Sequence, residues 1–238
     1  MPFRIALFRL AAPLLAAALL AGCATTNGNP RDPWEGLNRK TFAFNDALDE
    51  AVMKPVATGY QTYVPQVIRR GVSNFYGNLE DIGTSLNNIL QGKPQEGFSD
   101  ASRVLLNTTI GLLGLIDVAS DAGLEKHYED FGQTLGWWGM RPGPYLVLPF
   151  LGPSTARDAP AKAVDPSWYY GNAMNSDPAY WSFWTLDKVR TRADLLQAEG
   201  VVREAALDKY SFIRDAWLQR RRNMVYDGNP PRLKEDEE

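Results

Sequence analysis

Residues 32–48 read DPWEGLNRKTFAFNDAL, and this stretch decides the fold. Asp32, Pro33 and Glu35 stand where an N-cap, a first helical residue and the third residue of a capping box are expected. A mostly apolar stripe then returns every three or four residues, at Trp34, Leu37, Thr41, Phe44 and Leu48. Because this is the period of an α-helix, we predict an amphipathic helix from residue 33 to about residue 50, capped by Asp32.

Helical periodicity continues along most of the chain. It predicts further helices that begin at Pro55, cover residues 78–90, begin at Pro94, end at Val164, begin at Asp177 and cover residues 210–226. Pro65 should kink or break the helix that begins at Pro55. The segments between the helices are rich in glycine and proline. The fold class that we predict is therefore all-α, with Gly/Pro-rich connecting segments.

One segment departs from the helical pattern. Residues 141–154 hold several prolines and glycines and cannot form the interior of a helix. Within them, residues 145–150 could form one short strand, but nothing nearby offers a partner, so we expect an extended, packed segment. Ser154 or Thr155 is expected to cap the helix that follows.

The N-terminus is typical of an exported protein. After a basic start, residues 10–20 are uncharged and rich in Ala and Leu, but they are about half the roughly 20 residues that a spanning helix needs. They lead to Leu-Ala-Gly-Cys23, which resembles the lipobox of bacterial lipoproteins, the alternative being a free cysteine in a signal peptide. We predict that residues 1–22 are removed and that Cys23 carries lipid on a tether of residues 23–31. Ala24 implies export to the outer membrane in such lipoproteins.

Composition excludes several classes of protein. With 45% hydrophobic and 22% charged residues, the chain matches a folded globular protein, and its net charge of -3 offers no basic surface for nucleic acid. The single Cys23 and single His127 exclude an internal disulfide and a Cys/His zinc cage. No nucleophile elbow, phosphate loop or dinucleotide motif is present. We therefore expect no enzymatic activity, no cofactor and no metal site.

Aromatic residues gather in clusters beside Gly and Pro. Trp and Tyr favour the zone where hydrocarbon meets lipid headgroups, although any one cluster taken alone is more typical of a packed core. Several clusters in a chain with a predicted lipid anchor favour a protein that lies in or on one leaflet. The membrane-interface candidates are Trp34, Phe44, Trp137, Trp138, Trp181 and Trp184.

Many short blocks of the sequence closely resemble the MlaA (VacJ) lipoprotein family. In order they are DPWEGLNR at 32–39, KPVA at 54–57, YVP at 63–65, VSNF at 72–75, GNLE at 77–80, LQG at 90–92, LNT at 106–108, GLIDVA at 114–119, DFGQTLG at 130–136, GPY at 143–145, LPFLGPS at 148–154 and RD at 157–158. The resemblance covers residues 32 to about 158, with weaker agreement to residue 220. It indicates one domain over residues 32–228, followed by an acidic tail at residues 229–238.

This resemblance implies a function that composition does not. Members of the family form a helical ring or disc in the inner leaflet of the outer membrane, facing the periplasm, with a central amphipathic channel. The implied task is to remove mislocalised phospholipid from the outer leaflet, together with a trimeric porin and a soluble carrier, MlaC. The alternative is a structural or adaptor lipoprotein that braces porins or the cell envelope without moving lipid. A phospholipase is a third, weaker alternative.

If the protein has such a channel, polar and bent segments of the chain are candidates for its lining. A ring can move a headgroup through hydrocarbon if its inner wall is polar, because an unshielded charge there costs several kcal/mol or more. The channel-lining candidates are Asn38, Asn45, Asn74, Asn78, Gly143 and Tyr145. For the asparagines, caps and turns are an equally good explanation.

Overall fold

The computed structural model describes residues 29–169 and 177–232. Cys23, its tether up to residue 28 and residues 233–238 of the acidic tail lie outside the described residues. The elements are α2 Glu35–Leu48, the π-helical turn η2 Asp49–Met53, α3 Lys54–Tyr63, α4 Gln66–Leu90, α5 Pro94–Thr109, α6 Val118–Asp121, α7 Phe131–Trp137, β1 Tyr145–Leu148, β2 Gly152–Thr155, α8 Asp158–Tyr169, α9 Asp177–Ala205 and α10 Lys209–Val225.

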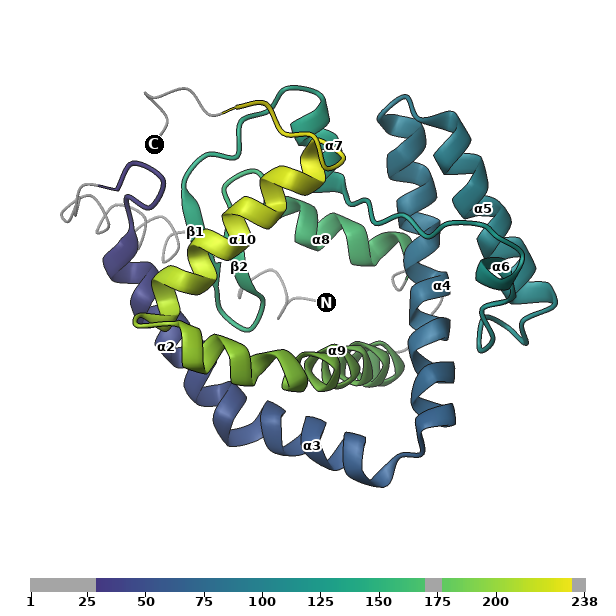
Figure 1. Ribbon diagram of the computed structural model, residues 1–238, viewed down its shortest axis with the longest axis horizontal. Coiled ribbons are helices and arrows are strands. Elements are labelled where there is room, and N and C mark those ends of the chain that lie inside the picture. The colour runs from purple at the N-terminus through teal and green to yellow at the C-terminus, as the bar shows by residue number, and fades with distance from the viewer. Residues whose placement is uncertain (1–28, 170–176, 233–238) are drawn as a thin grey trace, which may run out of the picture.

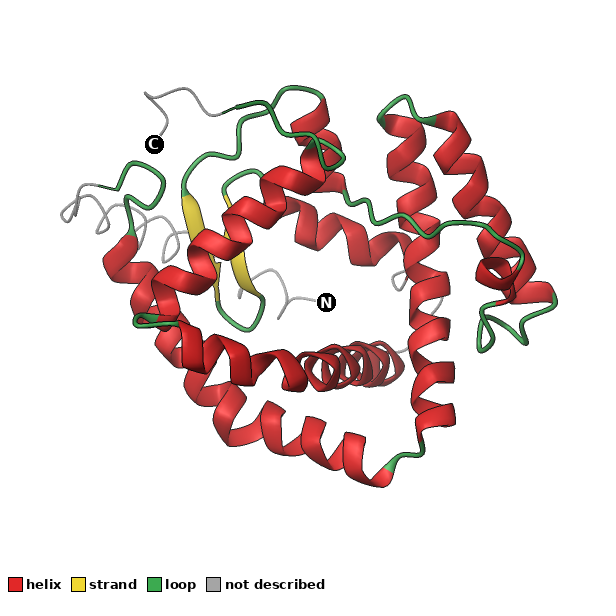
Figure 2. Cartoon of the chain, viewed as in Figure 1, coloured by secondary structure: helices red, strands yellow, loops and turns green. Residues whose placement is uncertain are grey.

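The helices follow one another around a ring, as Figure 1 shows. α2, η2 and α3 curve along one side, α4 closes the opposite side, and α7, α8 and α10 lie across the top of the view. α9 packs against α3, and α5 packs against α4 on the outside of the ring. The predicted fold class, a helical ring with Gly/Pro-rich connections, is confirmed, and Figure 2 shows how little of the chain is strand.

The break predicted at Pro65 is confirmed. α3 ends at Tyr63, and Val64 and Pro65 adopt extended backbone angles before α4 begins at Gln66. α4 then continues to Leu90, so the helix predicted over residues 78–90 is the second half of a longer one. In the described part of the chain, no helix combines the length and the apolar character needed to cross a bilayer.

The prediction for residues 145–150 was wrong, because they do have a partner strand. β1 pairs antiparallel with β2, in a register that joins Tyr145 to Thr155 and Leu148 to Gly152. Between the strands, Phe150 has φ 64° and Gly152 has φ 72°, which turns the chain back on itself. The pairing also places Ser154 and Thr155 in a strand, and α8 begins at Asp158, two residues later than a cap at Thr155 would give. Thr155 Oγ1 nevertheless accepts a hydrogen bond from the Asp158 amide at 3.2 Å, as a capping hydroxyl does.

The predicted cap at Asp32 was also wrong. α2 begins at Glu35, with Trp34 at the N-cap and no side-chain cap. The Asp32 carboxylate is buried and instead accepts hydrogen bonds from Asn38 Nδ2 at 2.8 Å, from Arg214 Nη1 at 3.2 Å and from the Tyr210 hydroxyl. The Asp32 carboxylate therefore joins the start of α2 to α10. A small apolar core lies nearby, where Tyr145 and Val147 of the hairpin pack against Tyr210 of α10.

Polarity is inverted over α4 and α5. Their buried residues include Asn78, Asp81, Thr84, Ser85, Asn87, Asn88, Asp100, Arg103 and Asn107. Their exposed residues include Leu86, Ile89, Leu90, Phe98 and Leu105. A water-soluble helix buries its apolar face. These two helices bury polar side chains and present apolar ones to the surroundings.

Candidate functional site

A network of buried charges joins α4, α5 and the segment that follows. The Arg103 side chain is 1% exposed, and its Nε donates to Asp81 Oδ2 at 3.1 Å. Its two Nη atoms donate to Leu124 O at 2.6 Å and to the Asp117 carboxylate at 3.2 Å. Lys126 also pairs with Asp81. Every group in this network has a partner, which is what buried charges require.

Hydrogen bonds lower the pKa of Asp117, one member of this network. Burial alone would raise the pKa of Asp117. Hydrogen bonds from Ser120 and Asn107 and the charge of Arg103 outweigh burial and lower that pKa to about 2. Nearby, Asn88 Nδ2 donates to Asp100 at 2.8 Å, and His127 Nδ1 lies 3.0 Å from the same carboxylate. Among the buried side-chain polar atoms of α4 and α5, all except Asn78 Oδ1 thus have hydrogen-bond partners.

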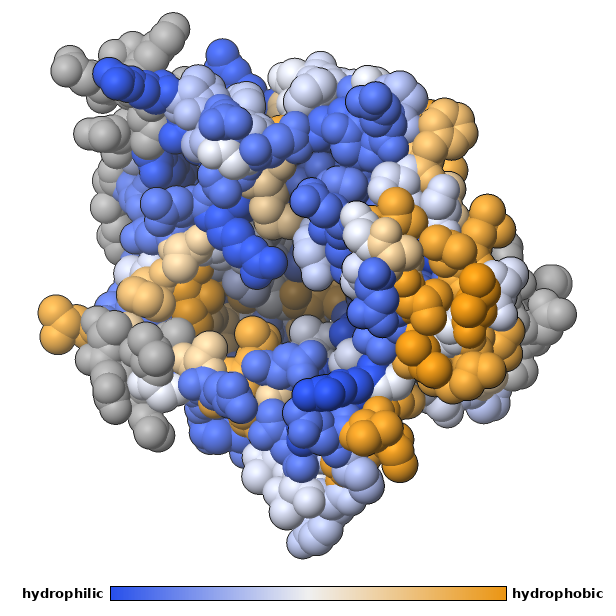
Figure 3. All heavy atoms as spheres, turned by 45° about the vertical axis from the view of Figure 1, so that its right-hand side comes forward, coloured by the Kyte–Doolittle hydropathy of each residue, from blue (hydrophilic) through white to orange (hydrophobic). Residues whose placement is uncertain are grey.

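The outside of the same region is apolar. Figure 3 shows hydrophobic surface gathered on the side of the molecule that carries α4, α5 and the loop after α5, while hydrophilic surface covers the top of that view. Residues 110–116 form this loop, and Ile110, Leu112 and Leu113 are 66%, 63% and 70% exposed. A contiguous exposed patch of this kind marks a surface that meets a membrane or another protein.

The apolar loop, residues 110–116, is rigid although it is exposed. Leu112 and Leu113 both hold left-handed φ angles, 52° and 59°, which cost energy in residues with a side chain. Six of its seven amides, all except that of Leu112, donate to carbonyl groups of residues 106–112, and Asn74 Nδ2 donates to Leu115 O at 3.1 Å. Most amides of the loop are therefore hydrogen-bonded, four of them to the end of α5, while its leucines are exposed.

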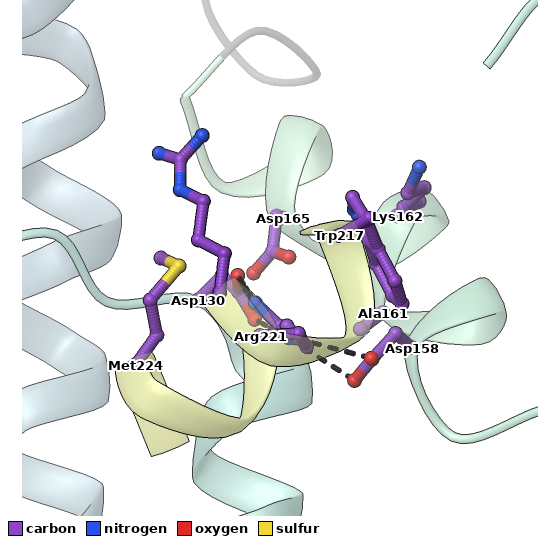
Figure 4. A pocket seen from close by; sticks show the side chains of 9 residues that line it. Asp130, Asp158, Ala161, Lys162, Asp165, Trp217, Arg221 and Met224 are labelled. Carbon is purple, nitrogen blue, oxygen red and sulfur yellow. Dashed lines mark hydrogen bonds and ion pairs between the residues drawn. The ribbon is translucent and has the colours of Figure 1, made fainter. Parts of the chain in front are cut away.

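A polar cavity of about 250 Å³ lies among α8, α10 and the start of α7, and its lining is drawn in Figure 4. Arg221 of α10 crosses it and binds two carboxylates, Asp158 at 3.0 Å and Asp130 at 2.6 Å. A Cβ at Gly132 would collide with Arg221 and Asp158, so this position needs glycine. Lys162, Asp165 and Trp217 complete the wall.

Four lining groups of this cavity have shifted pKa values, and that of Arg221 is raised because its pairing with Asp130 and Asp158 outweighs burial. Burial would raise the pKa of Asp158, but the hydrogen bond from Arg157 and the charge of Arg221 lower it. Burial lowers the pKa of Lys162 to about 8. Burial also raises the pKa of Asp165 to about 7, against the hydrogen bond from the Phe131 amide. The cavity thus contains one strongly paired cluster and two groups that burial disfavours in their charged forms.

A second hollow, of about 670 Å³, is apolar and runs between α3 and α9. It is lined by Val56, Tyr60, Val64, Trp181, Leu186 and Val189, among others. The Tyr60 hydroxyl is buried there without a hydrogen-bond partner in the described residues, and burial raises its pKa. The ring therefore carries one polar and one apolar hollow.

Three of the predicted channel-lining residues attach the hairpin to α2. Asn38 is 1% exposed and binds Tyr145 O at 3.0 Å and the Val147 amide at 2.9 Å. Asn45 binds Leu148 O and the Phe150 amide, both at 2.9 Å. Tyr145 is fully buried in the core under the hairpin. These contacts hold β1 along α2, and a channel-lining role for the three residues stays a prediction.

Of the other channel-lining candidates, Asn74 and Asn78 are on α4 and Gly143 is in the turn before β1. Asn74 supports the apolar loop, and Asn78 Nδ2 donates to Thr108 Oγ1 at 2.9 Å. Gly143 has φ 67° in the turn before β1, with Ala156 close by. Asn74 and Asn78 thus come together on α4, whereas Gly143 belongs to the hairpin on the other side of the ring. Their role in lining a channel is not decided by these contacts and stays a prediction.

Most of the membrane-interface candidates are exposed. Phe44, Trp137, Trp138 and Trp181 are 50%, 47%, 56% and 58% exposed, whereas Trp34 and Trp184 are half-buried. Phe44 packs edge-on against Phe150, and Trp181 packs edge-on against Trp184. Trp138 Nε1 donates to Leu90 O at 3.0 Å, so its polar edge is satisfied by the protein. Contact of these rings with a membrane stays a prediction.

Sequence analysis missed the charged groups of the polar cavity. Lys162 and Asp165 are three residues apart on α8 and therefore lie near the same face of that helix. This spacing was visible in the sequence. The pairing of Arg221 with Asp130 and Asp158 joins residues 63 and 91 positions apart, and no local pattern announces it.

Comparison with known proteins identifies the family. A model of the MlaA lipoprotein family matches residues 30–224. The intermembrane phospholipid transport system lipoprotein MlaA of Escherichia coli (strain K12) is 40% identical over 219 residues, which are 89% of this chain and 86% of that protein. The Haemophilus influenzae protein of the same name is 32% identical over 240 residues, 93% of this chain and 92% of that one.

A solved structure agrees with the sequence comparisons. It is described as "Structural basis for maintenance of bacterial outer membrane lipid asymmetry" and is 37% identical to this chain. The superposition has a TM-score of 0.72 and covers 82% of this chain and 98% of that one. The chain belongs to the MlaA lipoprotein family.

Proposed function

We propose that this protein is a lipid-anchored channel that removes phospholipid from the outer leaflet of the outer membrane and passes it toward the periplasm. The observation that carries the proposal is the inverted polarity of α4 and α5, with Arg103 and its carboxylates inside and Phe98 and Leu105 outside. Such a body is stable when hydrocarbon, rather than water, covers its exterior. Its polar interior offers a headgroup the hydrogen bonds that hydrocarbon lacks.

The two hollows of the ring support transport of a molecule with two kinds of surface. The polar cavity beside Arg221 suits a headgroup, and the apolar groove beside Trp181 suits an acyl chain. The Escherichia coli and Haemophilus influenzae relatives are both named for intermembrane phospholipid transport. Transport requires no covalent step, so the proposed role is not enzymatic.

The proposed location is the periplasm-facing leaflet of the outer membrane. Acyl chains on Cys23 would hold the protein there, since each buried CH₂ contributes about 0.8 kcal/mol. The apolar loop, residues 110–116, would lie in hydrocarbon, because its leucines are exposed and six of its seven amides donate to carbonyl groups of the protein, where the lipid offers no acceptor. The exposed Trp137 and Trp138 would lie nearer the headgroups.

Two partners complete the proposal. A trimeric porin would give the ring access to the outer leaflet, because none of the helices in the described residues is long and apolar enough to cross the bilayer itself. A soluble MlaC-like carrier would receive the lipid on the periplasmic side, since an acyl chain cannot cross water unshielded at an appreciable rate.

Outer-leaflet phospholipid, measured in cells with and without the gene, tests the proposed function. We expect phospholipid to accumulate in the outer leaflet of cells that lack the protein and to fall again when the wild-type chain is restored. Unchanged outer-leaflet phospholipid in the deleted strain, with a weakened envelope, would instead support a structural adaptor that braces porins. Release of lyso-lipid or fatty acid by the purified protein would indicate a phospholipase.

A further inference from the structure

Three charged side chains that line the polar cavity form no ion pair in the described part of the chain: the exposed Arg220 and the more buried Lys162 and Asp165. Arg221, the most deeply placed cation, is neutralised by Asp130 and Asp158. Among the described residues, neither Lys162 nor Asp165 forms an ion pair, with each other or with a third group. In the view of Figure 4, the two side chains lie to either side of the Trp217 ring.

The Lys162 ammonium group donates hydrogen bonds to backbone carbonyls rather than to carboxylates. Its Nζ donates to Pro153 O at 2.7 Å and to Leu151 O at 3.0 Å, both in the hairpin. An ammonium group has three N–H donors, so one is left for a ligand. The pKa of Lys162 is lowered, first by burial and then by the charge of Arg221, so an anion bound at Nζ would favour the charged form of this amine.

Asp165 presents the complementary acceptor. Its Oδ1 accepts a hydrogen bond from the Phe131 amide at 2.9 Å, at the start of α7. The Asn87 side chain also donates to this carboxylate, and the two bonds leave part of its acceptor capacity unused. Burial raises the pKa of Asp165, and the charge of Arg221 offsets this only in part. A ligand cation at this point would supply the missing partner.

We propose that this cavity binds a zwitterionic aminophospholipid headgroup, with the phosphate at Lys162 and the primary ammonium at Asp165. The unpaired charges of Lys162 and Asp165 have opposite signs, so a single ligand that carries both an anion and a cation can pair with both of them. At roughly 30 Å³ per water, 250 Å³ is the volume of about eight waters, and phosphoethanolamine has about as many heavy atoms. The inference rests on the proposed transport of phospholipid and assigns its preferred headgroup.

Other headgroups satisfy the cavity less well. Phosphatidylglycerol and inorganic phosphate carry an anion but no cation, so they would leave Asp165 unpaired. Phosphatidylcholine carries a quaternary ammonium, which cannot donate a hydrogen bond to Asp165. Phosphatidylethanolamine supplies a compact ammonium with three donors. The preference should therefore depend on Asp165, and phosphate binding itself should depend on Lys162.

Calorimetric binding of short-chain lipids to the purified, lipidated protein in detergent tests the inference. The probes are dihexanoyl phosphatidylethanolamine, dihexanoyl phosphatidylglycerol and inorganic phosphate. For the wild type, we expect phosphatidylethanolamine to bind about tenfold more tightly than either other probe, which is the effect of one good charge-assisted hydrogen bond. Equal binding of the two lipids, or phosphate binding as tight as that of phosphatidylethanolamine, would overturn the inference.

Matched variants separate the two roles. Lys162→Gln should weaken both lipids about tenfold, and Lys162→Arg, which keeps the charge, should restore them. Asp165→Asn should remove the preference and leave phosphatidylglycerol at or above its wild-type affinity. Lys188→Gln is the control, because Lys188 pairs with Asp187 on α9 and is outside the cavity lining. Wild-type affinities in Lys162→Gln, or a wild-type preference for phosphatidylethanolamine in Asp165→Asn, would contradict the assigned roles.

Failure of this inference and failure of the proposed function give different results. If the wild-type chain restores low outer-leaflet phospholipid in cells but binds both headgroups equally, transport stands and the headgroup site is wrong. If deletion of the gene leaves outer-leaflet phospholipid unchanged, transport itself is wrong, whatever the purified protein binds. Thermal unfolding of each variant, compared with that of Lys188→Gln, shows whether lost binding comes from a lost fold.

Discussion

Arg103 is a large charged side chain buried where a water-soluble protein would place a leucine. Its guanidinium holds Asp81 of α4 and Asp117 after α5 together. We expect Arg103→Met to lower the free energy of unfolding by about 3 kcal/mol, because both carboxylates lose a buried partner. Lys126 still binds Asp81 in the variant and limits the loss. Chemical unfolding in detergent measures the effect.

Two further variants serve as controls for Arg103. Arg70→Ala removes an exposed arginine on the same helix as Asp81 and should change the stability by less than about 0.5 kcal/mol. Adding Asp117→Asn to Arg103→Met should recover part of the loss, since Arg103 is the only ion-pair partner of Asp117 among the described residues and the uncompensated charge is removed. A loss in Arg103→Met no larger than that in Arg70→Ala would mean that the network does not stabilise the fold.

Asp165 should make stability depend on pH in an unusual direction. Burial raises its pKa from 3.8 to about 7 in the folded protein, so between these values the folded state binds more protons than the unfolded state. Stability should therefore fall as the pH rises from about 4 to about 7, by a few kcal/mol at roughly 1.4 kcal/mol per pKa unit. Asp165→Asn should flatten this part of the curve, measured by unfolding in detergent without lipid. An equal slope in the variant would show that another group is responsible.

At the residue scale, the sequence predicts types of side chain better than their partners. The channel-lining candidates include Asn38, Asn45 and Asn78, and all three make specific side-chain hydrogen bonds. Asn38 reaches a strand 107 residues away, and Asp32 reaches Arg214 182 residues away. Such pairs depend on the completed ring, so local patterns predict a cap at Asp32 where the structure has a long-range junction.

At the element scale, the helices were predictable and the hairpin was not. Periodic stripes and the proline at 65 indicate α2, α3, α5, α9 and α10 with small errors at their ends. β2 consists of Gly-Pro-Ser-Thr, which has low strand propensity and no alternation of apolar and polar residues. Its pairing is fixed by the turn at Phe150 and by Asn38 and Asn45 from α2, and these are tertiary contacts.

The conformation of the apolar loop depends on Gly114, which lies against Asn78 of α4. Gly114 has φ 90°, and a Cβ there would lie 2.8 Å from Asn78 Nδ2. Gly114→Ala should destabilise the protein by about 2 kcal/mol, because both the backbone and Asn78 must shift. Gly59→Ala is the matched control, since Gly59 lies within α3 with open space around it, and it should stabilise by about 0.5 kcal/mol. Thermal unfolding compares the two; equal shifts would refute the account of the loop.

The same loop should bind membranes without the lipid anchor. For the chain from residue 24 onward, Leu113→Asp should weaken binding to phospholipid vesicles several-fold, because a charge replaces a leucine in hydrocarbon. The fold should survive, since the side chain is 70% exposed. Leu207→Asp, in the turn before α10, replaces another fully exposed leucine and serves as the control. Flotation with vesicles measures binding, and equal loss in both variants would argue against a specific role for the loop.

At the scale of the whole molecule, the inverted polarity explains what sequence reasoning could and could not reach. An amphipathic stripe predicts a helix and its two faces, but it does not say which face is inside. In α4 and α5 the polar face is inside, around Arg103, and the apolar face joins the loop at residues 110–116. Only the assembled ring decides this orientation. The same orientation is what a body surrounded by hydrocarbon requires.

Nitroxide accessibility tests this central claim most directly. Because Cys23 is the sole natural cysteine, single cysteines at Leu105, Leu113 and Asn223 can be labelled selectively in the lipidated protein, reconstituted in vesicles. The account predicts that labels at Leu105 and Leu113 collide frequently with oxygen and rarely with a water-soluble nickel complex, as in hydrocarbon, and that the label at the exposed Asn223 of α10 shows the reverse. Frequent collision with the nickel complex at Leu105 and Leu113, equal to that at Asn223, would contradict it.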